Sequence, residues 1–294
     1  MPFDITALTS FWLFANSVIV SISLHIYRIS QKNKERSTSQ SFINSKKSVA
    51  DFEEHPQQRG TKRETVRYAI SDPHGAYTLV MRILEKIRFG DTDTLYIGGD
   101  MIDKGENSLR LLQFALESPN VHPILGNHEY DLIKRYRAMM RAETSDFSAV
   151  LDSLRAGFLP HECERLDWET LDALSELPAY IEAADFIMVH AGLPLDCAGY
   201  PLPLTEASIE SLLYDRRFLS PSLIQRGEKC ILFGHTETTV IADTPRILAY
   251  RRDKSRPAHA LADYHKIHLD TGVFSHGVLG CLCLDTLHSY YVSK

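Results

Sequence analysis

Short clusters of acidic, amide and imidazole residues recur along the chain, each directly after a run of apolar residues. The clusters are Ser71-Asp72-Pro73-His74-Gly75, Gly98-Gly99-Asp100, Gly126-Asn127-His128-Glu129, His190-Ala191-Gly192 and Gly234-His235-Thr236. Together they offer oxygen and nitrogen donor atoms without a thiolate, a set that suits Mn²⁺, Fe or Zn²⁺ better than Ca²⁺ or Cu(I). These residues therefore predict metal-assisted catalysis.

Each cluster alone has a structural explanation, because Asp, Pro and Gly favour turns and an acidic residue suits the first turn of a helix. The combination favours a metal centre. Asp72 and His74 stand at positions i and i+2, on one side of an extended backbone, so both can reach one ion. Asp100 can bridge two ions, and two cations roughly 3.5–4 Å apart can activate a bridging water for in-line attack on a phosphoryl group. The predicted metal ligands are Asp72, His74, Asp100, Asn127, His190 and His235.

The apolar runs before these clusters are typical of strands that alternate with helices. Strands are predicted at 66–70, 94–97, 121–125, 186–189, 230–233 and 267–269, helices at 77–87, 108–116 and 129–141, and a closing hairpin at 279–284 and 289–292. This alternation predicts an α/β fold with parallel strands joined by right-handed crossovers. Such sheets bind ligands at the carboxyl ends of their strands, which is where the clusters lie.

The ordered motifs resemble those of the phosphoprotein phosphatase family of serine/threonine phosphatases, most closely the bacterial and phage branch of these calcineurin-like metallophosphoesterases. The motifs that carry the resemblance are Asp72-x-His74-Gly75, Gly99-Asp100-x-x-Asp103-Lys104-Gly105, Gly126-Asn127-His128-Glu129, His190-Ala191-Gly192, Gly234-His235-Thr236 and Ile267-His268-Leu269-Asp270-Thr271-Gly272. The resemblance covers roughly residues 66–292. It implies a four-layer metallophosphoesterase sandwich, in which two mixed β-sheets are flanked by helices.

The same resemblance implies how the metals are held. Asp72, His74 and His235 are expected to hold one ion, and Asn127 and His190 the other. Asp100 is expected to bridge the two ions. Mn²⁺ is the expected metal, with Fe or Zn²⁺ as alternatives.

The resemblance also implies roles for residues beside the metals. His128 is expected to protonate the leaving oxygen, with Asp103 orienting its imidazole. Lys104 stands where the family usually carries Arg. Its ammonium is a point charge, whereas a guanidinium can hydrogen-bond to two phosphate oxygens at once. Arg216 is expected to make the second phosphate contact, with Asn127 beside it at the substrate. The alternative for Arg216 is a solvated pair with Arg217.

The N-terminal part of the chain differs in character from the rest. From residue 5 to 27 there is no Asp, Glu, Lys or Arg, which gives 23 uncharged residues, enough to span a bilayer as a helix. Basic residues follow this segment, so the positive-inside bias places the remainder in the cytoplasm. The sequence therefore predicts a membrane anchor at 1–29, a polar linker at 30–63 and a catalytic domain at 64–294. A buried core helix is the alternative for the first segment.

Composition narrows the class of function. The net charge of −6 and the pI near 6.1 argue against a nucleic-acid partner. The predicted activity is hydrolysis of phosphomonoesters by a metal-activated hydroxide, with phosphoserine or phosphothreonine in proteins as the expected substrate and small phosphoesters as another. One alternative is a dinucleoside polyphosphate hydrolase, although family members of that type usually lack the acidic residue that is Asp103 here. The other alternative is a non-catalytic, membrane-tethered phosphate-binding scaffold.

Overall fold

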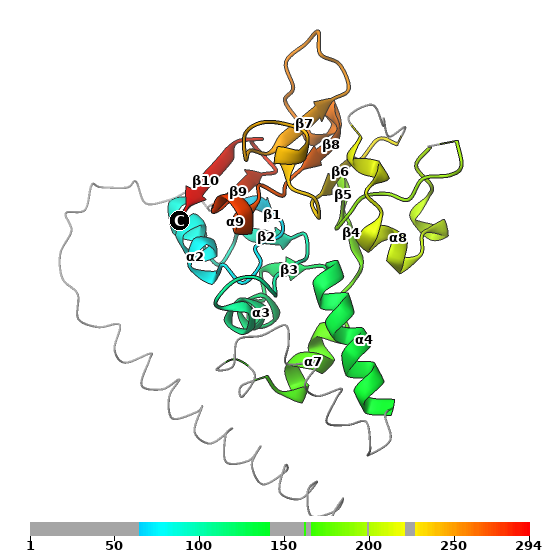
Figure 1. The fold of residues 1–294 in the computed structure, drawn as a ribbon. Coiled ribbons are helices and arrows are strands. Elements are labelled where there is room, and N and C mark those ends of the chain that lie inside the picture. Colours follow the sequence, from blue (N-terminus) through cyan, green and yellow to red (C-terminus); the bar gives the residue numbers. More distant parts are fainter. Residues whose placement is uncertain (1–64, 142–161, 163–165, 199, 221–226) are drawn as a thin grey trace, which may run out of the picture. The chain divides into compact units, whose positions relative to one another are not determined.

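The structure is a computed structural model that describes residues 65–141, 162, 166–198, 200–220 and 227–294. The described residues contain two five-stranded mixed sheets with helices against them (Figure 1). Within these residues no helix is both long and apolar enough to cross a bilayer. The predicted anchor at 1–29 and linker at 30–63 lie outside the described residues.

The first sheet has the strand order β10-β9-β1-β2-β3. Its parallel strands are β1 (Arg67–Ile70), β2 (Thr94–Ile97) and β3 (Val121–Pro123), and its antiparallel strands are β9 (Val278–Cys283) and β10 (Ser289–Ser293). The crossover helices are α2 (Tyr77–Lys86) and α3 (Ser108–Glu117), and α4 (Asn127–Arg141) follows β3. The predicted succession of strands and helices is confirmed, with α4 beginning two residues earlier than expected.

The second sheet has the strand order β4-β5-β6-β8-β7. Its central strands are parallel, namely β5 (Phe186–Val189), β6 (Cys230–Phe233) and β8 (Tyr264–His268). Its edge strands are antiparallel, namely β4 (Tyr180–Glu182) and β7 (Leu248–Arg251). Neither edge strand was predicted from the sequence. Both are short and partly exposed, so they lack the continuous apolar run that marks a buried strand.

Alternate residues of the strands separate the apolar layers. In β5, Phe186 and Met188 join one buried cluster and Ile187 and Val189 another. Successive side chains of a strand point to opposite faces, so each central strand supplies two cores at once. Ala69 of β1 joins the same cluster as Phe186, which makes that cluster the layer between the sheets. Helices α2, α3 and α4 cover the other face of the first sheet, as the predicted sandwich requires.

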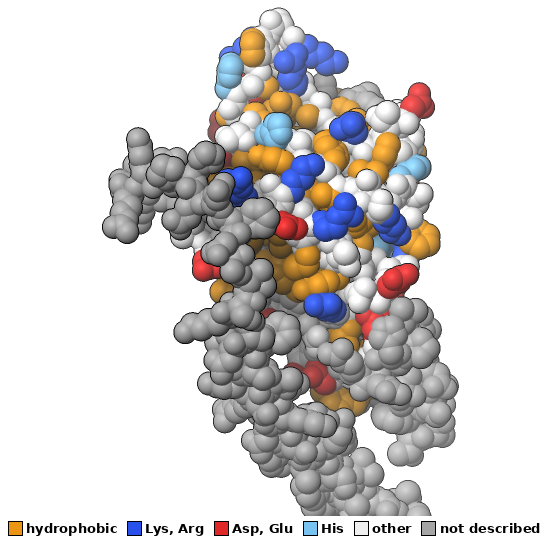
Figure 2. All heavy atoms as spheres, turned by 90° about the vertical axis from the view of Figure 1, so that its left-hand side faces the viewer, with side chains coloured by type: hydrophobic (Ala, Val, Ile, Leu, Met, Phe, Trp, Pro, Cys, Tyr) orange, Lys and Arg blue, Asp and Glu red, His pale blue; other side chains and the backbone are white. Residues whose placement is uncertain are grey.

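Figure 2 shows the face on the side of α2 and β10, where Lys and Arg side chains lie scattered among hydrophobic ones. Two cations of α2 hold the last strand in place. Arg82 donates a 2.6 Å hydrogen bond to the carbonyl of Ser293, and Lys86 donates a 2.8 Å bond to the carbonyl of Tyr291. They therefore satisfy carbonyl groups on the open edge of the sheet, which would otherwise be free to pair with another strand.

Candidate active site

The polar clusters lie in sharp turns at the carboxyl ends of the strands. Among the described residues, eight that are not glycine have a positive φ, and six of these are predicted site residues. The six are Asp72, His74, Asp100, Asp103, Lys104 and His235, with φ between 40° and 70°. Such conformations cost free energy and cluster at functional sites. The turns aim these side chains at one shared region instead of along their strands.

Two of the histidines are oriented by backbone carbonyl groups. His190 Nδ1 lies 2.8 Å from the carbonyl oxygen of Gly98, and His74 Nδ1 lies 3.2 Å from that of Ile102. A ring nitrogen so close to a carbonyl carries the proton and donates it, which leaves the lone pair on Nε2. Both rings therefore present Nε2 as a possible metal ligand.

Three possible ligand atoms crowd together beside Asp100. His190 Nε2 lies 3.0 Å from Asn127 Oδ1, and His235 Nδ1 lies 2.9 Å from the same oxygen and 3.2 Å from His190 Nε2. Asp100 Oδ1 lies 3.5 Å from His190 Nε2. An oxygen and nitrogen set of this kind fits a divalent cation. In the described part of the chain, the buried Nε2 of His235 has no hydrogen-bond partner.

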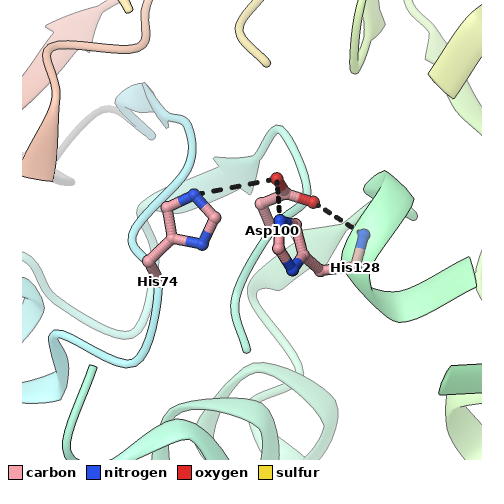
Figure 3. A group of neighbouring side chains, drawn as sticks. All are labelled: His74, Asp100 and His128. Atoms are coloured by element: carbon pink, nitrogen blue, oxygen red, sulfur yellow. Dashed lines mark hydrogen bonds and ion pairs between the residues drawn. The ribbon is translucent and has the colours of Figure 1, made fainter. Parts of the chain in front are cut away.

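A second group shares Asp100 with the first. The Nε2 atoms of His74 and His128 each lie 3.7 Å from Asp100 Oδ2. Figure 3 shows the two rings reaching the same carboxylate, one from the turn after β1 and the other from the start of α4. Each group contains ligand atoms that lie within 4.8 Å of one another. Asp100 is thus placed to serve two cations.

The electrostatics of both groups favour bound cations. Burial raises the pKa of Asp72 and of Asp100 to about 6, since neither carboxylate has solvent to stabilise its charge. Burial also lowers the pKa of His74 and of His235 to about 3, so both rings are neutral at pH 7. Neutral imidazoles beside destabilised carboxylates are the state in which metal ions are bound.

His235 lies with a different group from the one expected. The resemblance implies that it shares an ion with Asp72 and His74, whereas its Nδ1 lies close to Asn127 and His190. Its backbone N–H instead meets Asp72, at 3.1 Å from each carboxylate oxygen. At His235, where φ is 70°, the chain turns so that the backbone N–H points to Asp72 while the ring points to Asn127 and His190. A motif in the sequence identifies a ligand but not which of two adjacent ions it holds.

His128 and Asp103 form the predicted pair. His128 Nδ1 lies 2.5 Å from Asp103 Oδ2, and His128 Nε2 faces Asp100. Burial lowers the pKa of His128, but the hydrogen bond to Asp103 and the charges of both carboxylates outweigh burial, and the net pKa is raised. Asp103 therefore favours the protonated ring of His128, whose Nε2 faces the site.

Glu129 is a positioning residue whose role the sequence did not reveal. Its buried carboxylate accepts hydrogen bonds of 2.7–3.1 Å from the backbone N–H groups of Asp100, Met101, Ile102 and Gly126. It thereby ties the turn after β2 to the turn that opens α4. A carboxylate at the start of a helix was explained by the helix dipole alone, and no signal in one sequence distinguishes that role from this clamp.

The two predicted phosphate-binding cations line one cavity together with two of the predicted metal ligands. Its volume is about 270 Å³, and its walls include His74, Lys104, Arg216, His235 and Asp270. Arg217 turns elsewhere and pairs with Asp215 at 2.6 Å. Of the two arginines, Arg216 therefore lines the cavity and Arg217 does not.

Residues 67–276 match the calcineurin-like phosphoesterase family. The chain belongs to this family. The prediction that the chain is a calcineurin-like metallophosphoesterase is therefore confirmed.

Its named relatives lie on a different branch from the protein phosphatases. The symmetrical bis(5′-nucleosyl)-tetraphosphatase of Stutzerimonas stutzeri is 31% identical over 160 residues, which are 53% of this chain and 54% of that protein. The Pasteurella multocida enzyme of the same name is 32% identical over 133 residues, 44% of this chain and 45% of that protein. The chain thus spans about half the length of these curated relatives.

A solved structure supports the fold. The crystal structure of a putative diadenosine tetraphosphatase superposes with a TM-score of 0.54 over 78% of this chain and 94% of that one. The two chains are 19% identical, so the likeness concerns the fold alone. The expected α/β sandwich of two mixed sheets flanked by helices is confirmed.

Proposed function

We propose that this phosphoesterase hydrolyses dinucleoside polyphosphates at a two-metal centre. The observation that carries the proposal is the sharing of Asp100 between two groups of ligand atoms, next to a cavity lined by Lys104 and Arg216. His74 and Asp100 would hold one ion together with Asp72, which leaves His128 of that group free to act on the substrate. Asp100, Asn127, His190 and His235 would hold the other ion. Bound divalent ions would supply an activated water and neutralise phosphate charge.

The surrounding residues prepare the substrate for cleavage. Lys104 and Arg216 would offset the negative charge of the phosphate groups. A dinucleoside polyphosphate carries more of this charge than a phosphomonoester does. His128, whose Nε2 lies 3.7 Å from Asp100, would donate a proton to the oxygen that leaves. Asp103 keeps the ring of His128 in that tautomer through Nδ1. The names of the relatives favour a phosphoanhydride substrate over a phosphoprotein.

One observation favours the second candidate, a phosphomonoesterase that acts on phosphoserine or phosphothreonine. An alcohol leaves as a strongly basic alkoxide and needs a proton donor, whereas a nucleoside diphosphate leaves as a weak base. The 2.5 Å contact between His128 and Asp103 builds such a donor. A site adapted only to anhydrides has less need of it.

The test compares both substrate classes on the full-length protein. We would measure kcat/KM for diadenosine tetraphosphate and for a phosphoserine peptide, with Mn²⁺, Zn²⁺ or Fe²⁺ added after chelation. We expect the dinucleotide to be preferred by at least about tenfold. Separation of the products distinguishes symmetrical cleavage, which gives two ADP, from release of ATP and AMP. A preference for the peptide would replace the proposal with the second candidate.

A further inference from the structure

The active-site cavity is lined by both charged and apolar side chains, and its apolar residues Val240, Val273 and Phe274 are called the apolar wall below. Lys104 and Arg216 lie in its wall with the metal ligands, and the same cavity is also lined by Val240, Val273 and Phe274. Phe274 is 54% exposed and Val240 is 66% exposed. Large apolar side chains in a cleft that otherwise binds phosphate mark a place where a ligand covers them.

The apolar wall is built on two short segments that are joined by hydrogen bonds. Phe274 belongs to α9 (Val273–His276), and Val240 ends the 3₁₀ helix η4 (Thr238–Val240). The carboxylate of Glu237 accepts hydrogen bonds from the hydroxyl groups of Ser275 and Thr239. One side chain therefore joins both segments.

A second contact strengthens this junction. His276 Nε2 lies 3.2 Å from Thr239 Oγ1 and 3.3 Å from the carboxylate of Glu237. Residues fixed in this way lose little conformational entropy when a ligand binds. The backbone that carries the apolar wall is therefore preformed.

Glycine conformation keeps α9 close to the cavity wall. Gly272 precedes the helix with φ of 74°. A Cβ atom there would approach His276 Cδ2 to 2.7 Å and Glu237 Oε2 to 3.0 Å. Only glycine satisfies both the backbone angle and the space, so the turn projects Phe274 at a defined position.

We infer that Phe274 and Val240 form a nucleobase-binding site in the apolar wall of the active-site cavity. This inference rests on the proposed function, since a dinucleoside polyphosphate carries a base at a short distance from the phosphates. Every nucleobase has a flat π face that stacks on an aromatic ring. Glu237 suits a neutral nucleoside, because ribose hydroxyl groups can donate to its carboxylate, whereas an acidic peptide would be repelled.

The experiment uses the full-length, Mn²⁺-loaded protein and measures the binding of ADP, GDP and inorganic pyrophosphate by calorimetry. Phe274→Ala should weaken ADP and GDP binding by roughly 5-fold to 150-fold, the range for loss of one base–aromatic stack. Pyrophosphate binding should not change, because pyrophosphate has no base. Phe274→Tyr should restore nucleotide binding. Tyr200→Ala is the matched control, since Tyr200 is 50% exposed in a separate cavity.

The outcomes separate this inference from the proposed function. Unchanged ADP binding in Phe274→Ala, alongside wild-type hydrolysis of diadenosine tetraphosphate, would overturn the base site and leave the function standing. Phe274-dependent ADP binding without hydrolysis of the dinucleotide would overturn the function and support the site. If Phe274→Ala weakened the binding of a phosphopeptide but not of ADP, the apolar wall would be a peptide site and the inference would be wrong.

Discussion

The ring of His128 and the carboxylate of Asp103 are joined by a 2.5 Å contact between Nδ1 and Oδ2. Because this contact raises the pKa of His128, His128 retains its proton at higher pH than an isolated imidazole would. Asp103→Asn should lower the pKa of His128. The alkaline limb of the kcat profile should then move to lower pH, as measured from pH 5 to 9. A limb that stays in place would assign the titration to another group.

Removal of the imidazole itself should separate leaving groups. His128→Ala should reduce kcat by roughly 10²–10⁴-fold for an alkyl phosphate, the range for a lost general acid. The loss should be smaller for diadenosine tetraphosphate, whose leaving group needs less protonation. Metal content, measured by elemental analysis, should be unchanged in the variant. Equal losses on both substrates would contradict the role of His128 as an acid.

Lys104 should contribute charge without a fixed fork. Its ammonium lies 2.9 Å from His74 Nε2, so it must move when an ion binds that nitrogen. Lys104→Ala should raise KM by roughly 10-fold to 100-fold, as expected for a lost charge-assisted hydrogen bond, while metal affinity holds or improves. Lys104→Arg should retain or lower KM, because a guanidinium grips two oxygens. An Ala variant with wild-type KM would leave Arg216 as the phosphate contact.

Metal binding should stabilise the fold more at neutral than at acidic pH. The raised pKa values of Asp72 and Asp100, about 6 against 3.8 when unfolded, mean that their buried charges oppose folding of the metal-free protein. This penalty is complete above pH 6 and disappears as pH falls below 3.8. A saturating ion should offset it by about 2.7 kcal/mol at 100 times its Kd.

The measurement is the melting temperature with Mn²⁺ and with chelator. The difference should be larger at pH 7.5 than at pH 5. Asp72→Asn serves as the comparison, because it should raise the melting temperature in chelator and shrink the response to Mn²⁺. A response to Mn²⁺ that is equal at both pH values would argue against these carboxylates as ligands.

Lys266 should act on substrate affinity through the segment that follows Arg216. Its buried Nζ donates hydrogen bonds of 2.6 Å and 2.7 Å to the carbonyls of Phe218 and Ser220. Lys266→Met keeps the length but leaves both acceptors without this donor, at about 1–3 kcal/mol of unfolding free energy for each unsatisfied group. We expect KM to rise several-fold with kcat little changed. Lys229→Ala, at the surface ion pair with Glu182, is the control. A KM of Lys266→Met equal to that of the control would exclude the coupling.

The sequence predicted the central strands and the site better than the edges of the sheets. Buried parallel strands need continuous apolar runs, and the ligands must follow them, so position and chemistry coincide at Asp72, Asp100 and His235. Strand β7 lies in a basic run instead, where Arg252 donates to the carbonyls of Gly227 and Tyr264. Tertiary hydrogen bonds of this kind leave no local pattern.

The same distinction applies within the site. The types of the predicted ligands followed from donor chemistry, and their convergence followed from strand order. Which ligand atoms lie beside His235 depends on the backbone angle at that residue. The hydrogen bonds of Glu129 depend on contacts between turns that are distant in sequence. Neither the backbone angles nor the contacts between distant turns can be read from a single sequence.

The left-handed turns at the active site have a consequence for engineering. Six predicted site residues occupy conformations that glycine adopts more easily, so each is a position where stability and activity are in conflict. Replacing Asp103 or Lys104 with glycine would relieve the backbone and remove the side chain that acts. Selection for thermal stability alone would therefore favour glycine at these turns and yield a more stable but inactive protein. A screen for thermostable variants of this phosphoesterase should hold these positions fixed.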